Sequence, residues 1–108
     1  MNSFDDRLKG FEAKYSHDQD VQFRVHSRRD KLIGLWAAGQ FGLEGDAATE
    51  YAKSVVLSDF EEPGDDDVIR KLAADFASHG QPMDEAALRG RLDHFHHEAK
   101  KQIADEIG

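Results

Sequence analysis

The chain has 108 residues, 39% of them hydrophobic, which suits one domain that buries roughly two-thirds of its unfolded surface. It carries 14 lysines and arginines against 22 aspartates and glutamates, and this net charge of −8 argues against nucleic-acid binding. It contains no cysteine, which excludes disulfides and thiolate metal sites.

Two apolar stripes of helical spacing run through the first forty residues, and they differ in phase. The earlier stripe consists of Phe4, Leu8, Phe11 and Tyr15. The later stripe, which is rotated by roughly 90° from it, consists of Val21, Val25, Leu32 and Trp36. Two faces indicate two packing partners: the chain's own core for the later stripe and a second protein for the earlier one. The pattern predicts an inhibitory or docking arm ahead of a small helical bundle.

The earlier stripe has an alternative interpretation, in which it folds onto the bundle as part of the core. The phase difference, the polar link 16–20 and the helix-weakening Gly10 all argue against it. An isolated helix of about fifteen residues is also marginal in water. We therefore expect residues 1–19 to be disordered or partly helical when free, and to order as an amphipathic helix in a partner's groove.

Four amphipathic helices are predicted after the arm. Asp46 and Asp65 are suitable N-caps for the second and third of them, and the fourth begins at Asp84. The connecting loops are short, which fits an all-α, antiparallel four-helix bundle over residues 20–108. The predicted helices cover roughly residues 21–40, 46–60, 65–79 and 84–103.

A histidine cluster near the carboxyl end is the first candidate metal site. His94 has Glu98 one helical turn later, which provides two ligands where zinc needs three or four. We therefore interpret His94, His96 and His97 as solvated side chains beside the core residue Phe95. No metal site is expected.

The acidic run 61–67 resembles a calcium loop only superficially, because Val68 and Ile69 stand where ligands would be needed. We interpret the run as capping the helix that follows it. The sequence also contains no nucleophile elbow and no glycine-rich phosphate loop. We therefore expect a protein that is not an enzyme, with no catalytic residues and no cofactor.

The basic cluster of Arg28, Arg29 and Lys31 leaves two interpretations open. It forms ion pairs with the chain's own acidic body, or it contacts a phosphate or a partner. The alternative function is a small nucleotide- or ion-sensing regulatory bundle, with either this basic cluster or the histidines as its site. Residues 1–31 hold 7 basic and 6 acidic side chains, whereas 32–108 hold 7 and 16. The amino-terminal segment is thus electrostatically distinct from the body.

Several segments, spread over nearly the whole chain, together point to a family: Phe4–Arg7, Phe11–Tyr15, Arg28–Ala38, Tyr51–Lys53, Asp59–Asp65 and Val68–Lys71. With them the chain resembles the zeta subunit of alpha-proteobacterial F-type ATP synthases. The resemblance implies a four-helix bundle with an inhibitory amino-terminal segment, here about Met1 to Gln19. In that family the segment enters the catalytic head between alpha and beta subunits near gamma, and it stops ATP hydrolysis. Gly10 and the histidine cluster depart from the family pattern.

The resemblance and the apolar stripe predict the same partner-binding segment. Its four apolar residues would anchor the interface, and its charged residues would set the register. The predicted partner-binding residues are Phe4, Asp5, Arg7, Leu8, Phe11, Glu12, Lys14 and Tyr15. The expected partners are the alpha, beta and gamma subunits of the catalytic head, and the free bundle is expected to be monomeric.

No membrane insertion is expected. No run approaches the roughly 20 apolar residues that span a bilayer, and the start lacks the pattern of a signal peptide. The arm is also poorly suited to lie on anionic lipid, because it contains Asp5, Asp6 and Glu12. We expect a cytoplasmic protein, peripheral to the inner membrane through the ATP synthase.

Overall fold

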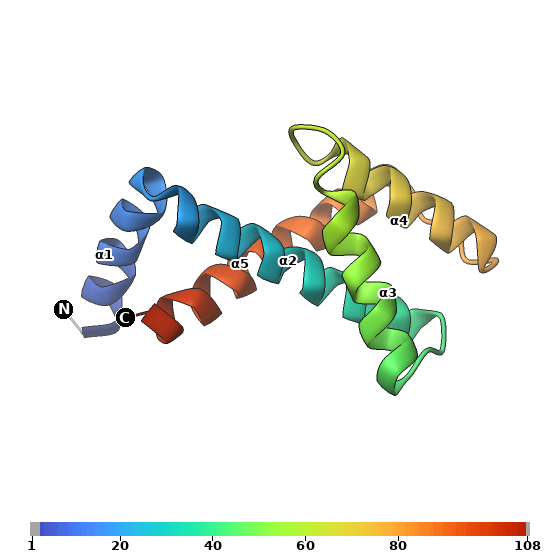
Figure 1. Cartoon of the computed structure of the whole chain (residues 1–108), viewed down its shortest axis with the longest axis horizontal. Helices are drawn as coiled ribbons and strands as arrows, with labels where there is room; N and C mark the ends of the chain where they lie inside the picture. The colour runs from blue at the N-terminus through green and yellow to red at the C-terminus, as the bar shows by residue number, and fades with distance from the viewer. Residues whose placement is uncertain (1–2, 108) are drawn as a thin grey trace.

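The structure, a computed structural model, describes the backbone of residues 3–107 and the side chains of residues 9–107. Within these residues the chain is all-α, with five helices and no strand. The helices are α1 (Ser3–His17), α2 (Gln19–Gln40), α3 (Gly45–Ser58), α4 (Asp66–Ser78) and α5 (Glu85–Ile107). Helix α2 is central and contacts the other four. At one end of the molecule α1 lies near the carboxyl end of α5, and at the other end lie α3 and α4 (Figure 1).

The all-α prediction is confirmed, and the four helices predicted after the arm correspond to α2 through α5. The arrangement differs from a regular antiparallel bundle. Helices α3 and α5 pack most extensively on α2, whereas α4 contacts its neighbours only over short stretches. Helix α3 crosses α2 obliquely (Figure 1). The amino-terminal segment also forms a helix of its own, packed on α2 and α5.

Helices α1 and α2 are separated by a single residue, Asp18, whose backbone is extended (φ −110°, ψ 108°). Its side chain accepts hydrogen bonds from the backbone N–H groups of Asp20 (2.9 Å) and Val21 (3.3 Å). An aspartate in this position satisfies donors that the first turn of a helix leaves unpaired. The side-chain amide of Gln22 also donates to the backbone oxygen of Tyr15 at 2.9 Å. The helix break therefore lies inside the polar link predicted from the sequence.

The main core is formed where α2, α3, α4 and α5 meet. Trp36 packs against it as predicted, with its ring centroid 5.5 Å from that of Phe76 and 6.3 Å from that of Phe95. The guanidinium of Arg91 lies over the same indole ring, 4.9 Å from its centroid. The buried residues of this core are Ile33, Ala37, Val55, Val68, Ile69, Leu72, Phe76, Leu88 and Leu92.

The predicted helix caps are confirmed in part. Asp84, where the last helix is predicted to begin, lies just before α5 and caps it by accepting a hydrogen bond from the backbone N–H of Ala87 at 2.8 Å. Asp65 occupies the N-cap position of α4, but its side chain makes no capping bond and pairs with Arg29 at 3.1 Å. The prediction for Asp46 is wrong, because it lies in the first turn of α3 and not at the N-cap.

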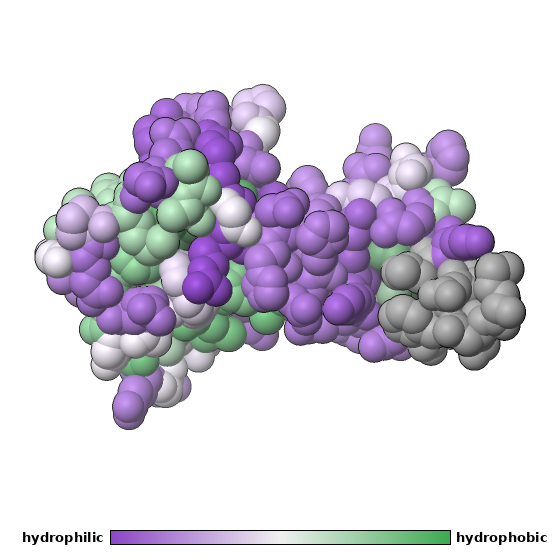
Figure 2. All heavy atoms as spheres, turned by 180° about the vertical axis from the view of Figure 1, so that it is seen from behind, coloured by the Kyte–Doolittle hydropathy of each residue, from purple (hydrophilic) through white to green (hydrophobic). Residues whose placement is uncertain are grey.

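Hydrophobic and hydrophilic side chains are unevenly distributed over the surface. Seen from behind, the middle of the molecule is hydrophilic, and hydrophobic residues gather at the end that carries α3 and α4 (Figure 2). None of the described helices combines the length and the hydropathy that crossing a membrane requires.

Candidate functional site

The predicted arm is a helix whose apolar stripe packs on the rest of the chain. Phe11 is only 5% exposed, and Tyr15 is half-buried beside it. The expectation that these two residues have no place on the bundle is therefore wrong. The structure shows, for both, the alternative that the sequence left open. The docking face, as we call the surface that receives Phe11, consists of Val21, Val25, Ala99, Ile103 and Ala104.

The break at Asp18 explains how a stripe that is out of phase with α2 still reaches the core. A straight helix would carry Phe11 and Tyr15 to a different side from Val21 and Val25. The chain instead turns at Asp18. As a result, α1 does not continue the axis of α2 but lies near the carboxyl end of α5 (Figure 1). Helix α1 consequently contacts both α2 and α5.

Polar side chains surround the aromatic residue at the centre of this contact. The hydroxyl oxygen of Tyr15 lies 3.4 Å from Nε2 of His96 and 3.5 Å from Nε2 of His26. The ammonium of Lys100 lies over the Tyr15 ring, 4.7 Å from its centroid, and also pairs with Glu12 at 3.2 Å. One side chain from α5 thus binds two residues of α1.

His96 is half-buried at the junction of three helices. Its ring nitrogen Nδ1 is buried and has no hydrogen-bond partner among the described residues. Burial, with the nearby cations Arg29 and Lys100, lowers the pKa of His96 to about 4. Burial and Arg29 also lower the pKa of His26, whose ring centroid lies 5.7 Å from that of His96. Near neutral pH both imidazoles are therefore uncharged.

The prediction that the histidine cluster is solvated is confirmed for His94 and His97, which are exposed, and is wrong for His96. The sequence contained a signal for the difference. His96 lies four residues after Leu92 and three before Ala99, so it shares their face of the helix. No group of three or more potential metal ligands is found among the side chains that the structure describes.

The structure places half of the predicted partner-binding residues. It brings Phe11, Glu12 and Tyr15 onto the bundle, whereas Lys14 is exposed. The sequence interpretation did not assign His26, His96 or Lys100 to this site, because only the folding back of α1 brings them to it. Four predicted residues lie outside the described side chains: Phe4, Asp5, Arg7 and Leu8.

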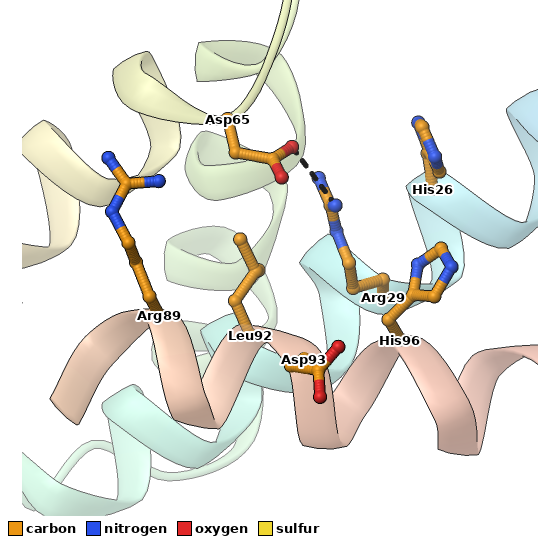
Figure 3. Close-up of a pocket in the computed structure, with 7 residues that line it drawn as sticks. All are labelled: His26, Arg29, Asp65, Arg89, Leu92, Asp93 and His96. Atoms are coloured by element: carbon orange, nitrogen blue, oxygen red, sulfur yellow. Dashed lines mark ion pairs between the residues drawn. The ribbon is translucent and has the colours of Figure 1, made fainter. Parts of the chain in front are cut away.

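A hollow of about 360 Å³ lies next to this contact. Figure 3 shows its two arginines on different sides, with the dashed ion pair joining Arg29 to Asp65. The other arginine, Arg89, pairs with Asp66 at 2.6 Å and with Glu85 at 2.8 Å. Both arginines are thus engaged by carboxylates, which argues against a phosphate site here. The lining residues are His26, Arg29, Asp65, Arg89, Leu92, Asp93 and His96.

The basic cluster predicted on α2 makes ion pairs inside the chain. Arg28 pairs with Glu106 of α5 at 2.6 Å. Arg29 is buried and pairs with Asp30 at 3.0 Å as well as with Asp65. Lys31, the third member, is exposed. The structure therefore favours the first of the two interpretations for both arginines.

Comparison with known proteins covers α1 as well as the bundle. The family model described as ATPase inhibitor subunit zeta matches residues 1–102. A protein whose structure was determined by NMR in solution is 42% identical, over 80% of this chain and 98% of that one, with a TM-score of 0.70. No curated protein matches the chain. The family match therefore includes the arm, three of the five residues of the docking face and most of α5.

Proposed function

Because this chain belongs to the ATPase inhibitor subunit zeta family, we propose that it blocks ATP hydrolysis by inserting α1 into the catalytic head of ATP synthase. The family supports the role of a regulatory, inhibitory subunit. The site of insertion that we propose lies between alpha and beta subunits and next to gamma. The observation that carries the proposal is that the matched residues include α1. This is a separate amphipathic helix, and the single residue Asp18 connects it to α2.

The arm has the composition of an interface helix. Its aromatic and aliphatic stripe would supply buried anchors, which dominate the energetics of most interfaces. Phe11 is 5% exposed on the docking face, so its ring is not accessible to a second protein in this conformation. We therefore infer that α1 leaves the docking face, by rotation at Asp18, before or while it enters the catalytic head.

The test is steady-state ATP hydrolysis by purified catalytic heads, measured against increasing amounts of the full chain. The informative variant combines Phe4→Ala with Leu8→Ala, because these positions belong to the predicted stripe. Losing buried anchors is expected to weaken inhibition by at least about tenfold. Leu57→Ala is the matched control, since Leu57 is 65% exposed on α3 and belongs to no part of the arm.

Each outcome of this titration has a definite meaning. Full inhibition by the control and weak inhibition by the arm variant support the proposal. Equal inhibition by both would place the inhibitory surface on the bundle and would contradict the role of α1. No inhibition by the unaltered chain would contradict the proposed function itself. Circular dichroism of all three proteins verifies that each is folded.

A further inference from the structure

The junction of Tyr15, His26 and His96 joins α1 to the two helices that receive it. We propose that this junction is an acid-sensitive latch, which holds α1 on the docking face while both histidines are neutral and releases it when they become protonated. The three side chains come from α1, α2 and α5 respectively, so a change at the junction acts on the docking of α1. The neighbouring Phe11 supplies apolar attraction that does not depend on pH.

The hydrogen bonding of His96 favours the neutral ring while α1 is docked. A neutral imidazole carries one N–H, which leaves the other nitrogen as an acceptor, whereas a protonated one carries two N–H donors. Nδ1 of His96 is buried, and none of the side chains described in residues 9–107 forms a hydrogen bond with it. Protonation would therefore leave at least one charged ring with an N–H donor that finds no acceptor inside the junction. Release of α1 would expose that donor to water.

The charged groups that face the two imidazoles also oppose their protonation. From α2 comes the guanidinium of Arg29, and from α5 come the ammonium of Lys100 and the imidazole of His97, all of which disfavour a cation at His96. His26 and His96 also oppose each other's protonation, since their ring centroids are only 5.7 Å apart. Four basic groups thus converge where a further positive charge would form.

The acidic side chains nearby form ion pairs with other residues. Asp59 and Asp65 bind Arg29 at 3.4 and 3.1 Å. On α1, Glu12 binds Lys100 at 3.2 Å, and on α5, Asp93 lies 3.7 Å from His97. None of these contacts is with the ring nitrogens of His26 or His96. The carboxylates therefore reduce the repulsion only in part, consistent with the lowered pKa of both histidines.

The direction of the effect follows from linkage. The pKa of His96 is about 4 when α1 is docked, and it returns toward the ordinary histidine value of 6.5 when the ring is exposed to water. Docking is therefore fully favoured above pH 6.5 and is weakened as the pH falls from there toward 4. For His96 alone, the ratio of released to docked α1 rises about tenfold between pH 7.5 and pH 5.5.

The inference rests on the proposed function for its consequence, since the released arm is the form that we expect to inhibit. Acidification should then strengthen inhibition of ATP hydrolysis. The docking equilibrium itself belongs to the free protein and is measured without ATP synthase. A pH-dependent release without inhibition would support the latch and contradict the proposed function.

The experiment measures the distance between α1 and α5 by fluorescence energy transfer in the full chain. The chain lacks cysteine, so Ala13→Cys and Lys101→Cys provide two labelling positions, both at exposed residues. Transfer is expected to fall between about pH 7.5 and pH 5.5 as α1 is released. His96→Phe, which keeps an aromatic ring without a titratable group, is expected to keep α1 docked at both pH values.

Controls separate the latch from other causes. His94→Gln alters an exposed histidine of the same helix and should leave the pH dependence unchanged. If His96→Phe fails to dock α1 at neutral pH, the variant His26→Gln with His96→Gln tests the same point, and it should remove the pH dependence. A constant distance in the unaltered protein would overturn the proposal. Full pH dependence in the histidine variants, or loss of overall helicity at the lower pH, would overturn it as well.

Discussion

The buried side chain of Arg29 connects three acidic residues from two parts of the chain. Its side chain is 4% exposed and contacts three carboxylates, of which Asp30 is adjacent in α2 and Asp59 and Asp65 flank the loop between α3 and α4. Burial, together with its hydrogen bond to Asp59, raises the pKa of Asp30. Charge therefore joins the loop to the central helix, in addition to the ring contact between Phe60 and Phe23, whose centroids lie 5.8 Å apart.

Removing the side chain of Arg29 should lower the stability of the fold. Arg29→Ala would remove the buried partner that Asp30, Asp59 and Asp65 share, and we expect the free energy of unfolding to fall by about 3–5 kcal/mol. Arg28→Ala removes a neighbouring arginine whose partner Glu106 is 40% exposed, and should lower it by no more than about 1 kcal/mol. Urea denaturation of both variants measures the difference. Similar losses for the two would contradict the structural role assigned to Arg29.

Single residues also show where sequence-based prediction ends. The solvated positions of His94 and His97 and the cap at Asp84 follow from local rules, because helical spacing and capping depend on neighbours in sequence. The burial of His96 was not predicted, because the helix that covers it belongs to a segment about eighty residues earlier. The helical spacing places His96 on the same face as Leu92, but it does not indicate that Tyr15 contacts His96.

At the level of helices, the crossing of α2 and α3 depends on a glycine. A Cβ atom at Gly34 would lie 2.8 Å from Cα of Ala52 and 3.3 Å from a methyl of Val55. The contact with Ala52 is with backbone, which cannot move aside without shifting α3. Glycine is therefore required here by the close approach of two helices, despite its low helix propensity.

This close approach distinguishes two glycines of the same helix. Gly34→Ala is expected to lower the free energy of unfolding by about 1–3 kcal/mol, because the added methyl overpacks the crossing. Gly39→Ala, where a Cβ meets nothing within 4 Å, is expected to raise it by up to about 1 kcal/mol through helix propensity. Thermal unfolding of the two variants gives the sign of each effect. Stabilisation by Gly34→Ala would mean that the crossing is looser than described.

The helices themselves were predictable, but the docking of α1 was not. The 3.6-residue period and the caps are properties of short segments, so α2 through α5 were found within a few residues of their ends. The docking of α1 depends on the direction that the chain takes at Asp18, which periodicity does not specify. A difference in stripe phase indicates either a second partner or a bend. Here the polar link 16–20 indicates where the chain bends, but it does not indicate the direction of the bend.

At the level of the whole molecule, α1 contributes to stability without being required for the main core. A chain that begins at Asp18 keeps the N-cap of α2 and should still unfold cooperatively. Its free energy of unfolding should fall by about 2–3 kcal/mol, because the burial of Phe11 is lost. Chemical denaturation followed by circular dichroism tests this, with Phe11→Ala in the full chain as the matched comparison. Loss of the cooperative transition would show that α1 is integral to the core.

The single-residue connection at Asp18 has a further consequence for how tightly the arm can bind a partner. A tether this short presents the docking face to α1 at an effective concentration in at least the millimolar range. Any second protein competes with that intramolecular site, so its apparent dissociation constant is the intrinsic one divided by the released fraction of α1. While that fraction is small, a tenfold change in the docking equilibrium constant of α1 changes the apparent affinity for the partner tenfold. The contacts of the interface itself stay the same. Affinity for the partner is thus set in part by residues that the partner never touches.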